Sequence, residues 1–247
     1  MDTGRALLVG IGRFDADLSG GEVPLGESVW SDLPFVDEVV PPVAAALSRL
    51  GYATDVRRDI GGEALWAAVA GAIGSARVVY VASHGKPSGS NPHRVDVVPS
   101  DARVGPGTNA AQWVDDAQES GVPTLFLLDL CRSGRAAALP HLVHGSHAPA
   151  NAWVIAASGA GEDAYDGRFS IALAEVLQDV ADTGLDTDPS VETTGARVVV
   201  AHSLGGIGRT FEGVDIDEHT VIDTFDFHLA KNYLAHQRLG AILRDTL

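Results

Sequence analysis

The sequence has little cysteine, little basic charge and no long apolar run. Cys131 is the only cysteine in 247 residues, so no disulfide can form within the chain. No stretch approaches the 18 uninterrupted apolar residues that indicate a membrane-spanning helix. The first residues, Met-Asp-Thr-Gly, lack the basic and apolar regions of a secretory signal. We therefore expect a cytoplasmic protein that is not embedded in a membrane.

Basic residues are outnumbered by acidic ones. The chain has 17 Lys and Arg against 33 Asp and Glu, a formal charge of −16. A surface of this sign repels the phosphates of nucleic acids and of anionic membranes, so we expect neither as a partner. The same charge favours cationic substrates, although the solubility of an acidic protein would explain it equally well.

The length and the apolar content are those of a single α/β domain. With 45% hydrophobic and 20% charged residues, the chain can bury one large core. We expect one domain over residues 1–247, with its core at about 5–180 and a less regular carboxyl-terminal part at 195–247.

Short apolar runs alternate with segments of helical periodicity, a pattern typical of parallel sheets with right-handed crossovers. The predicted strands cover 5–11, 53–57, 78–82, 124–130 and 153–157, with a small hairpin around 95–98. The predicted helices cover 33–50, 62–73, 109–120 and 169–180. The expected fold is a three-layer αβα sandwich around a mostly parallel sheet of about six strands.

Some segments carry a less regular pattern. Pro41 and Pro42 favour a helix that begins only at Pro41, because proline interrupts a helix beyond its first turn. Residues 136–151 predict an exposed loop, and the acidic segment 182–195 predicts a linker. Residues 197–201 fit a strand or the inner part of a helix, and 221–243 fit a largely helical segment.

The apolar run that ends at Cys131 predicts a buried strand, stopped by the turn residues Ser133 and Gly134. In a parallel sheet the carboxyl ends of all strands lie at one edge, where ligands bind. Taken alone, Cys131 is either a nucleophile at that edge or a small buried apolar side chain, as most single cysteines are.

His84 follows the predicted strand 78–82 in the same way, so it meets Cys131 if the two strands are neighbours. An imidazole can take the thiol proton and later protonate a leaving amine. Gly85 leaves room for a carbonyl oxygen to approach a backbone N–H, and the amide of Cys131 can be the second oxyanion donor. His84 and Cys131 are therefore the candidate catalytic pair, with Gly85 and Cys131 as the oxyanion donors.

With these residues in place, the chain resembles the caspase and metacaspase clan of cysteine proteases, in its bacterial metacaspase form. In that clan a His-Gly pair ends one strand and the cysteine follows roughly 50 residues later; here the separation is 47 (131 − 84). Residues 129–134 read Asp-Leu-Cys-Arg-Ser-Gly and match the metacaspase form Asp-x-Cys-x-Ser-Gly. Residues 6–11, 156–158 and 167–170 resemble the first strand, the fifth strand and the Gly-x-Phe-Thr helix start, so the resemblance covers about 5–180.

The resemblance implies a specificity pocket for Arg or Lys on the acyl side of the scissile bond. Asp129 occupies the position of the pocket aspartate two residues before the cysteine. Asp37 is our choice for the second pocket acid, with Asp32 as the alternative, and Ser158 is a further substrate-binding candidate. Without a pocket, Asp129 would be a strand-end carboxylate that accepts backbone N–H groups, and Asp37 an ordinary acid at a helix start.

Two positions depart from the family pattern, without removing a catalytic group. Ser83 precedes the histidine where the family usually has glycine, and Arg132 stands where metacaspases often have histidine. We predict no metal site and no cofactor. Calcium activation, seen in many metacaspases, is not carried over, because an acidic loop such as 182–188 binds calcium only in a suitable geometry.

The implied function is a cysteine endopeptidase that cuts protein substrates after exposed Arg or Lys. Small bacterial members of the clan further imply an activating protein partner in a cell-death or antiphage defence system. One alternative is a catalytically silent or partner-gated binding module of the same fold. Another is a serine hydrolase using Ser203, since residues 201–206 resemble Gly-x-Ser-x-Gly. Against the latter, residue 201 is alanine, and only 44 residues (247 − 203) remain for the acid and the histidine.

Overall fold

The computed structural model describes residues 4–15, 30–88, 94–137, 152–158, 163–164 and 167–183, together with four short strands at 197–201, 209–211, 214–216 and 222–226.

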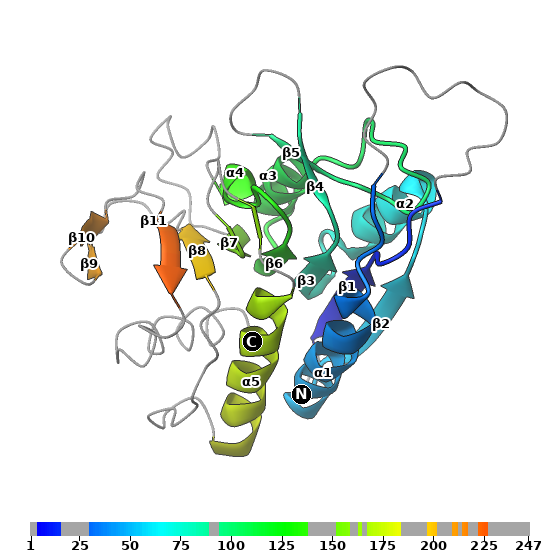
Figure 1. Cartoon of the computed structure of the whole chain (residues 1–247). Coiled ribbons are helices and arrows are strands. Elements are labelled where there is room, and N and C mark those ends of the chain that lie inside the picture. Colours follow the sequence, from blue (N-terminus) through cyan, green and yellow to red (C-terminus); the bar gives the residue numbers. More distant parts are fainter. Residues whose placement is uncertain are drawn as a thin grey trace, which may run out of the picture.

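A seven-stranded sheet forms the centre of the protein (Figure 1). Its strands, in chain order, are β1 (Arg5–Gly10), β2 (Ala53–Arg58), β3 (Ala76–Ala82), β6 (Thr124–Asp129), β7 (Ala152–Ala156), β8 (Arg197–Ala201) and β11 (Ile222–Asp226). Their order across the sheet is β11-β8-β7-β6-β3-β1-β2. Five neighbouring strands, β7, β6, β3, β1 and β2, run parallel, whereas β8 and β11 are antiparallel to their neighbours. Two small antiparallel ribbons pair β4 (Gly85–Pro87) with β5 (Val95–Val97) and β9 (Arg209–Phe211) with β10 (Val214–Ile216).

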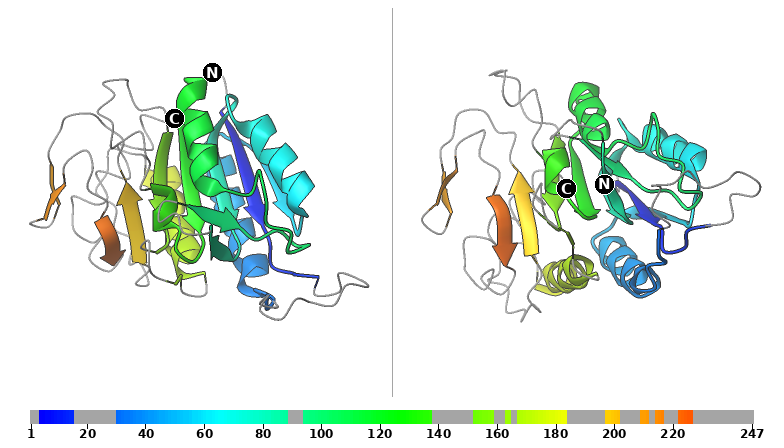
Figure 2. Two further views of the ribbon diagram at one scale, coloured as in Figure 1. Left: turned by 90° about the horizontal axis from the view of Figure 1, so that it is seen from above. Right: turned by 45° about the horizontal axis from the view of Figure 1, so that its top comes forward.

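Helices cover both faces of the sheet (Figure 2). The helices are α1 (Phe35–Arg49), α2 (Gly62–Ala72), α3 (Ala110–Ser120), the single turn α4 (Gly134–Ala137) and α5 (Arg168–Thr183). Helices α1 and α5 pack on one face, and α2, α3 and α4 pack on the other. The two helical layers therefore enclose two separate hydrophobic cores.

Strand β6 shows why both faces of the sheet are apolar. All six of its residues are buried. Leu125 and Leu127 point into the core beneath α1 and α5, while Phe126 and Leu128 point into the core beneath α2 and α3. Because successive side chains alternate between faces, a strand covered on both sides reads as a continuous apolar run. This confirms the predicted α/β sandwich with a mostly parallel sheet.

The carboxyl-terminal strands enlarge the sheet beyond the predicted six. Residues 197–201 form strand β8, which settles the two alternatives in favour of a strand. The largely helical expectation for 221–243 is wrong at Ile222–Asp226, because the backbone of this segment pairs with β8. The remaining residues, 227–243, lie outside the described part of the chain.

The prediction that the first helix begins at Pro41 is wrong, since α1 begins at Phe35. Pro41 and Pro42 remove the N–H groups that would bond the carbonyls of Asp37 and Glu38. All four of these residues are exposed, so water can satisfy the carbonyls that lose a partner. Six buried residues on the opposite face of α1 supply the packing that keeps the helix continuous.

Two predicted irregular segments are seen only in part. Residues 136–137 of the predicted loop belong to the helical turn Gly134–Ala137, and the side chain of Ala136 is buried in the core near α3. Residues 138–151 of the predicted loop and 184–195 of the predicted linker lie outside the described residues. The single-domain organisation over 1–247 stays a prediction.

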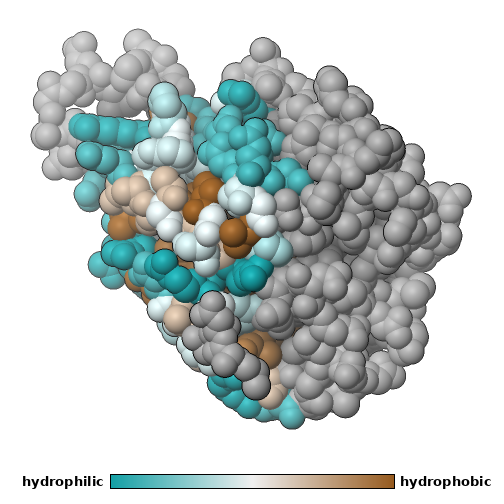
Figure 3. Space-filling view, turned by 180° about the vertical axis from the view of Figure 1, so that it is seen from behind, coloured by the Kyte–Doolittle hydropathy of each residue, from teal (hydrophilic) through white to brown (hydrophobic). Residues whose placement is uncertain are grey.

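The described surface is mainly polar. Viewed from behind, Figure 3 shows hydrophobic residues interspersed with hydrophilic ones over the described part of this face. In the described part of the chain, the large hydrophobic residues that are exposed are Val56, Trp66 and Ile171. None of the helices described there has both the length and the apolar character needed to cross a membrane.

A pair of glycines tests the packing of α1 on the sheet. A Cβ added to Gly10 would lie 2.7 Å from Cγ2 of Val40, whereas one added to Gly71 of α2 would meet no heavy atom within 4 Å. We expect Gly10→Ala to lower the free energy of unfolding by about 1–3 kcal/mol, because buried valines cannot swing aside. Gly71→Ala should raise it by roughly 0.5–1 kcal/mol. Urea denaturation measures both, and a neutral Gly10→Ala variant would contradict the packing.

Candidate active site

The predicted catalytic residues lie at the carboxyl ends of two neighbouring parallel strands. Ala82 of β3 pairs with Asp129 of β6, so His84 and Cys131 each follow this pair by two residues. The backbones meet directly: a Cβ added to Gly85 would lie 2.0 Å from the carbonyl oxygen of Cys131 and 3.2 Å from its amide nitrogen. Only glycine fits at this position, and the neighbouring strand ends required for a His-Cys pair are present.

The β4–β5 ribbon holds the backbone around His84. The amide of Val98 donates to the carbonyl oxygen of His84 at 3.0 Å. The hydroxyl of Ser83 donates to the carbonyl oxygen of Val98 at 2.7 Å, and Ser83 is buried. Ser83, the departure from the family pattern, thus connects the end of β3 to the residue that follows β5.

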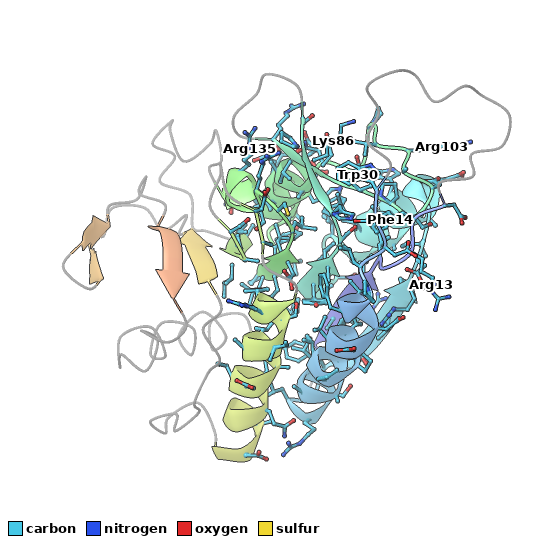
Figure 4. All side chains as sticks on the ribbon, in the orientation of Figure 1. Arg13, Phe14, Trp30, Lys86, Arg103 and Arg135 are labelled. Atoms are coloured by element: carbon cyan, nitrogen blue, oxygen red, sulfur yellow. The ribbon has the colours of Figure 1, made fainter. Side chains whose placement is uncertain are left out.

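The imidazole of His84 is held by the segments that flank the loop after β1. Its Nε2 lies 2.8 Å from the carbonyl oxygen of Ser31. Because a carbonyl oxygen only accepts, Nε2 carries the proton and Nδ1 is left as the basic nitrogen. The rings of Phe14 and Trp30 each pack on His84 at a centroid separation of 4.9 Å, and Figure 4 shows both at this end of the sheet.

Burial lowers the pKa of His84, and the hydrogen bond to Ser31 opposes this only in part. The ring is therefore neutral near pH 7, which is the form needed in a general base. Phe14, Trp30 and Ser31 were not predicted from the sequence, because residues 13–31, rich in Gly, Asp and Ser, fit neither a helix nor a strand. Two aromatic side chains in so polar a segment were the available signal.

Cys131 is partly buried, and its sulfur accepts a hydrogen bond from the amide of Ala164 at 3.4 Å. Burial raises the pKa of the thiol; the Ala164 N–H opposes this, and so does the charge of Arg132. The acids Asp163 and Asp129 raise the pKa further. The resting residue is therefore a thiol. Among the described residues, no hydrogen bond joins its side chain to His84.

Hydrogen bonds from Ser158 stabilise the turn that contains Cys131. Arg132 has a left-handed backbone (φ 59°), uncommon outside glycine. The hydroxyl of Ser158 donates to the carbonyl oxygen of Leu130 at 3.0 Å, and its own carbonyl oxygen accepts from Gly134 at 2.8 Å. The amide of Ser133 donates to the Ser158 hydroxyl at 3.3 Å. Ser158 is only 1% exposed, and its hydrogen bonds hold this turn. Its role in substrate binding stays a prediction.

Asp129 is buried beside the nucleophile. It is 2% exposed, and it accepts a hydrogen bond from the hydroxyl of Ser170 at 2.5 Å. Burial raises its pKa to about 6, while the hydroxyl and the backbone N–H of Ser170 act in the opposite direction. A carboxylate in this position can pair with a cation that reaches it.

The second predicted pocket acid has different surroundings. The side chain of Asp37 is 57% exposed and forms an ion pair with Arg58, with Arg13 at 3.8 Å. The alternative, Asp32, accepts a hydrogen bond from the amide of Phe14 at 3.0 Å. Asp37 thus already has basic partners within the chain, whereas Asp129 is held by a neutral hydroxyl.

Within the described ranges, no group of three or more His, Cys, Asp and Glu side chains gathers where it could hold a metal ion. Ser203 and most of the acidic segment 182–188 lie outside those ranges.

No known protein-family model matches the sequence, and no curated protein matches it. Among solved structures, the chain is similar to caspase-1 from Spodoptera frugiperda. The two share 14% sequence identity with a TM-score of 0.48, over 75% of this chain and 73% of that one.

The aromatic packing on His84 gives a testable pKa change. Trp30→Ala admits water to the ring, so the pKa of His84 should rise toward its ordinary value of about 6.5. Trp30→Phe keeps an aromatic ring there and should preserve most of the lowering. NMR titration of the imidazole protons, with the His84 signal assigned through His84→Gln, measures both. Equal pKa values in wild type and Trp30→Ala would show that this ring does not desolvate His84.

Proposed function

We propose that this chain is a cysteine endopeptidase with Cys131 as nucleophile and His84 as general base and acid. The observation that carries the proposal is the direct backbone contact between Gly85 and Cys131, at two strand ends that the pairing of β3 with β6 places side by side. Further support comes from His84, whose Nε2 proton is engaged by Ser31 and whose Nδ1 is thereby the basic nitrogen.

The pKa directions indicate how the reaction would begin. The pKa of Cys131 is raised and that of His84 is lowered, so both are neutral at rest. Proton transfer therefore accompanies attack: Nδ1 of His84 takes the thiol proton as sulfur bonds to the carbonyl carbon. The amides of Gly85 and Cys131 would then donate to the oxyanion that forms.

The intermediate collapses when His84 returns its proton to the leaving amine and the C–N bond breaks. A thioester between the acyl group and Cys131 remains. Water then gives a proton to His84 as it attacks the thioester, and the C–S bond breaks to release the carboxylic acid. The proton returns to sulfur, which restores the thiol and the neutral imidazole.

We further propose that the enzyme cleaves after Arg or Lys, with Asp129 as the pocket acid. The support is a buried carboxylate only two residues before the nucleophile. A guanidinium that reached it would form a charge-assisted contact and offset the cost of its burial. Asp37 would first have to exchange Arg58 for a substrate cation, so its contribution would be smaller.

A partner-gated module is the second candidate, and the state of the nucleophile favours it. The sulfur accepts the Ala164 N–H and is not hydrogen-bonded to His84 among the described residues. A protein partner that moves Ala164 away would free the thiol. A bacterial cell-death or antiphage setting for such a partner follows from the family resemblance.

Labelling and turnover test the catalytic pair together. The wild-type chain should cleave fluorogenic peptides after Arg or Lys, and an electrophilic arginine peptide should add its mass to Cys131. Cys131→Ala should remove turnover and labelling while circular dichroism stays unchanged, and His84→Ala should slow turnover by roughly 10²–10⁴-fold. Residual turnover in Cys131→Ala would reject the nucleophile. An inert wild-type chain, with and without calcium, would favour the gated module.

Selectivity tests the pocket acid. The ratio of kcat/KM for an arginine peptide to that for its neutral citrulline counterpart should fall in Asp129→Asn by an amount equivalent to about 2–4 kcal/mol, because a buried charge pair is lost. The matched variant Asp37→Asn should change the ratio by less than about 1 kcal/mol, since this side chain is exposed. An unchanged ratio in Asp129→Asn would place the pocket elsewhere.

A further inference from the structure

A chain of three buried polar groups ends at Asp129. The hydroxyl of Ser170, in the first turn of α5, lies 2.5 Å from Oδ2 of Asp129 and 2.6 Å from the hydroxyl of Tyr80. Ser170 and Tyr80 are both fully buried. The chain therefore links β3, α5 and β6 within the hydrophobic core beneath α1 and α5.

The direction of the hydrogen bonds follows from the number of protons available. An ionised carboxylate only accepts, so Ser170 gives its single hydroxyl proton to Asp129. The oxygen of Ser170 must then accept the proton of the other contact, which Tyr80 donates. Burial and the charge of Asp129 both raise the pKa of Tyr80, so the phenol keeps this proton.

We propose that Tyr80 and Ser170 are positioning residues which hold the Asp129 carboxylate ionised and fixed, ready to receive a basic side chain of the substrate. This inference rests on the proposed function, because it assigns the receiving group of the specificity pocket. It adds two residues that do not touch the substrate: Ser170 contacts Asp129, and Tyr80 contacts Ser170.

The chemistry of the holding groups is what suits them to this role. Hydroxyl dipoles stabilise a buried carboxylate without cancelling its charge. An arginine of the chain would stabilise it more strongly but would compete with the substrate for the same site. Asp37, paired with Arg58, illustrates that second arrangement. Asp129 thus keeps a net charge beside the nucleophile.

Among the described residues, the charged groups near these three side chains come from several elements. Arg58, at the end of β2, acts electrostatically on Tyr80, and on α1 Asp37 pairs with Arg58. Cys131 lies in the turn after β6, and the charge of Asp129 raises the pKa of its thiol. On α5, Glu175 lies more than one turn beyond Ser170, and burial raises its pKa.

The hydrogen-bonded series Tyr80–Ser170–Asp129 is called the relay below. The pH dependence of stability distinguishes a relay that holds a charge from ordinary packing of the same side chains. The pKa of Asp129 in the folded chain is about 6, above its ordinary value of 3.8. Ionisation of this carboxyl therefore disfavours the folded state, and the stability present below pH 3.8 is lost as the pH rises through about 6. Ser170→Ala removes a hydrogen bond to the carboxylate and should raise the pKa further. Its deficit in thermal midpoint relative to wild type should then grow between pH 5 and pH 8.

Three further variants complete the experiment. Ser170→Thr keeps a hydroxyl and should restore the wild-type profile. Tyr80→Phe should change it in the same direction as Ser170→Ala but less, because Ser170 still donates. In an Asp129→Asn background, the pH-dependent part of the Ser170→Ala deficit should vanish, since no charge remains to be held. A deficit that is constant with pH, or that survives Asp129→Asn, would overturn the relay.

Peptide cleavage gives the second readout. The acidic limb of kcat/KM for an arginine peptide should move to higher pH in Ser170→Ala, with about a tenfold loss at pH 6.5 and a smaller loss at pH 8.5. Cleavage with an unmoved limb would overturn the relay and leave the peptidase standing. A relay seen in the stability profiles of a chain that cleaves nothing would support the holding of Asp129 and contradict the proposed function.

Discussion

The pairing of β3 with β6 is the interaction on which the rest of the candidate site depends. Because Ala82 stands opposite Asp129, the next residues of both strands leave the sheet at the same height. A slip of one residue would turn the side chains of β6 to the opposite faces and place Asp129 in the other core. The apolar residues of β6, all buried, therefore fix the site as well as the fold.

The strand ends could be predicted from the sequence, whereas the surroundings of the side chains could not. Runs of apolar residues in the sequence predict strands β3 and β6, and the ends of these runs predict where His84 and Cys131 leave the sheet. Phe14 and Trp30 lie in irregular segments, which have no periodicity to read. The Asp37–Arg58 ion pair joins α1 to the end of β2, where Arg58 lies beside Gly10 of β1, so it depends on the packing of separate elements. The helical expectation at Ile222–Asp226 failed because the strand depends on a partner distant in sequence.

The two acids predicted for one pocket show how burial and partners give one residue type different properties. Asp37 is exposed and paired with arginine, so its charge is balanced locally. Asp129 is enclosed and held by a hydroxyl, so its charge is not balanced. Sequence motifs identify such positions, but the contrast depends on which neighbours the fold supplies.

The close approach of Gly85 to the carbonyl of Cys131 also has a mechanical consequence. No side chain lies between the two backbones to absorb a displacement by changing rotamer. A displacement of the β4–β5 ribbon would therefore be transmitted directly to the backbone of the nucleophile.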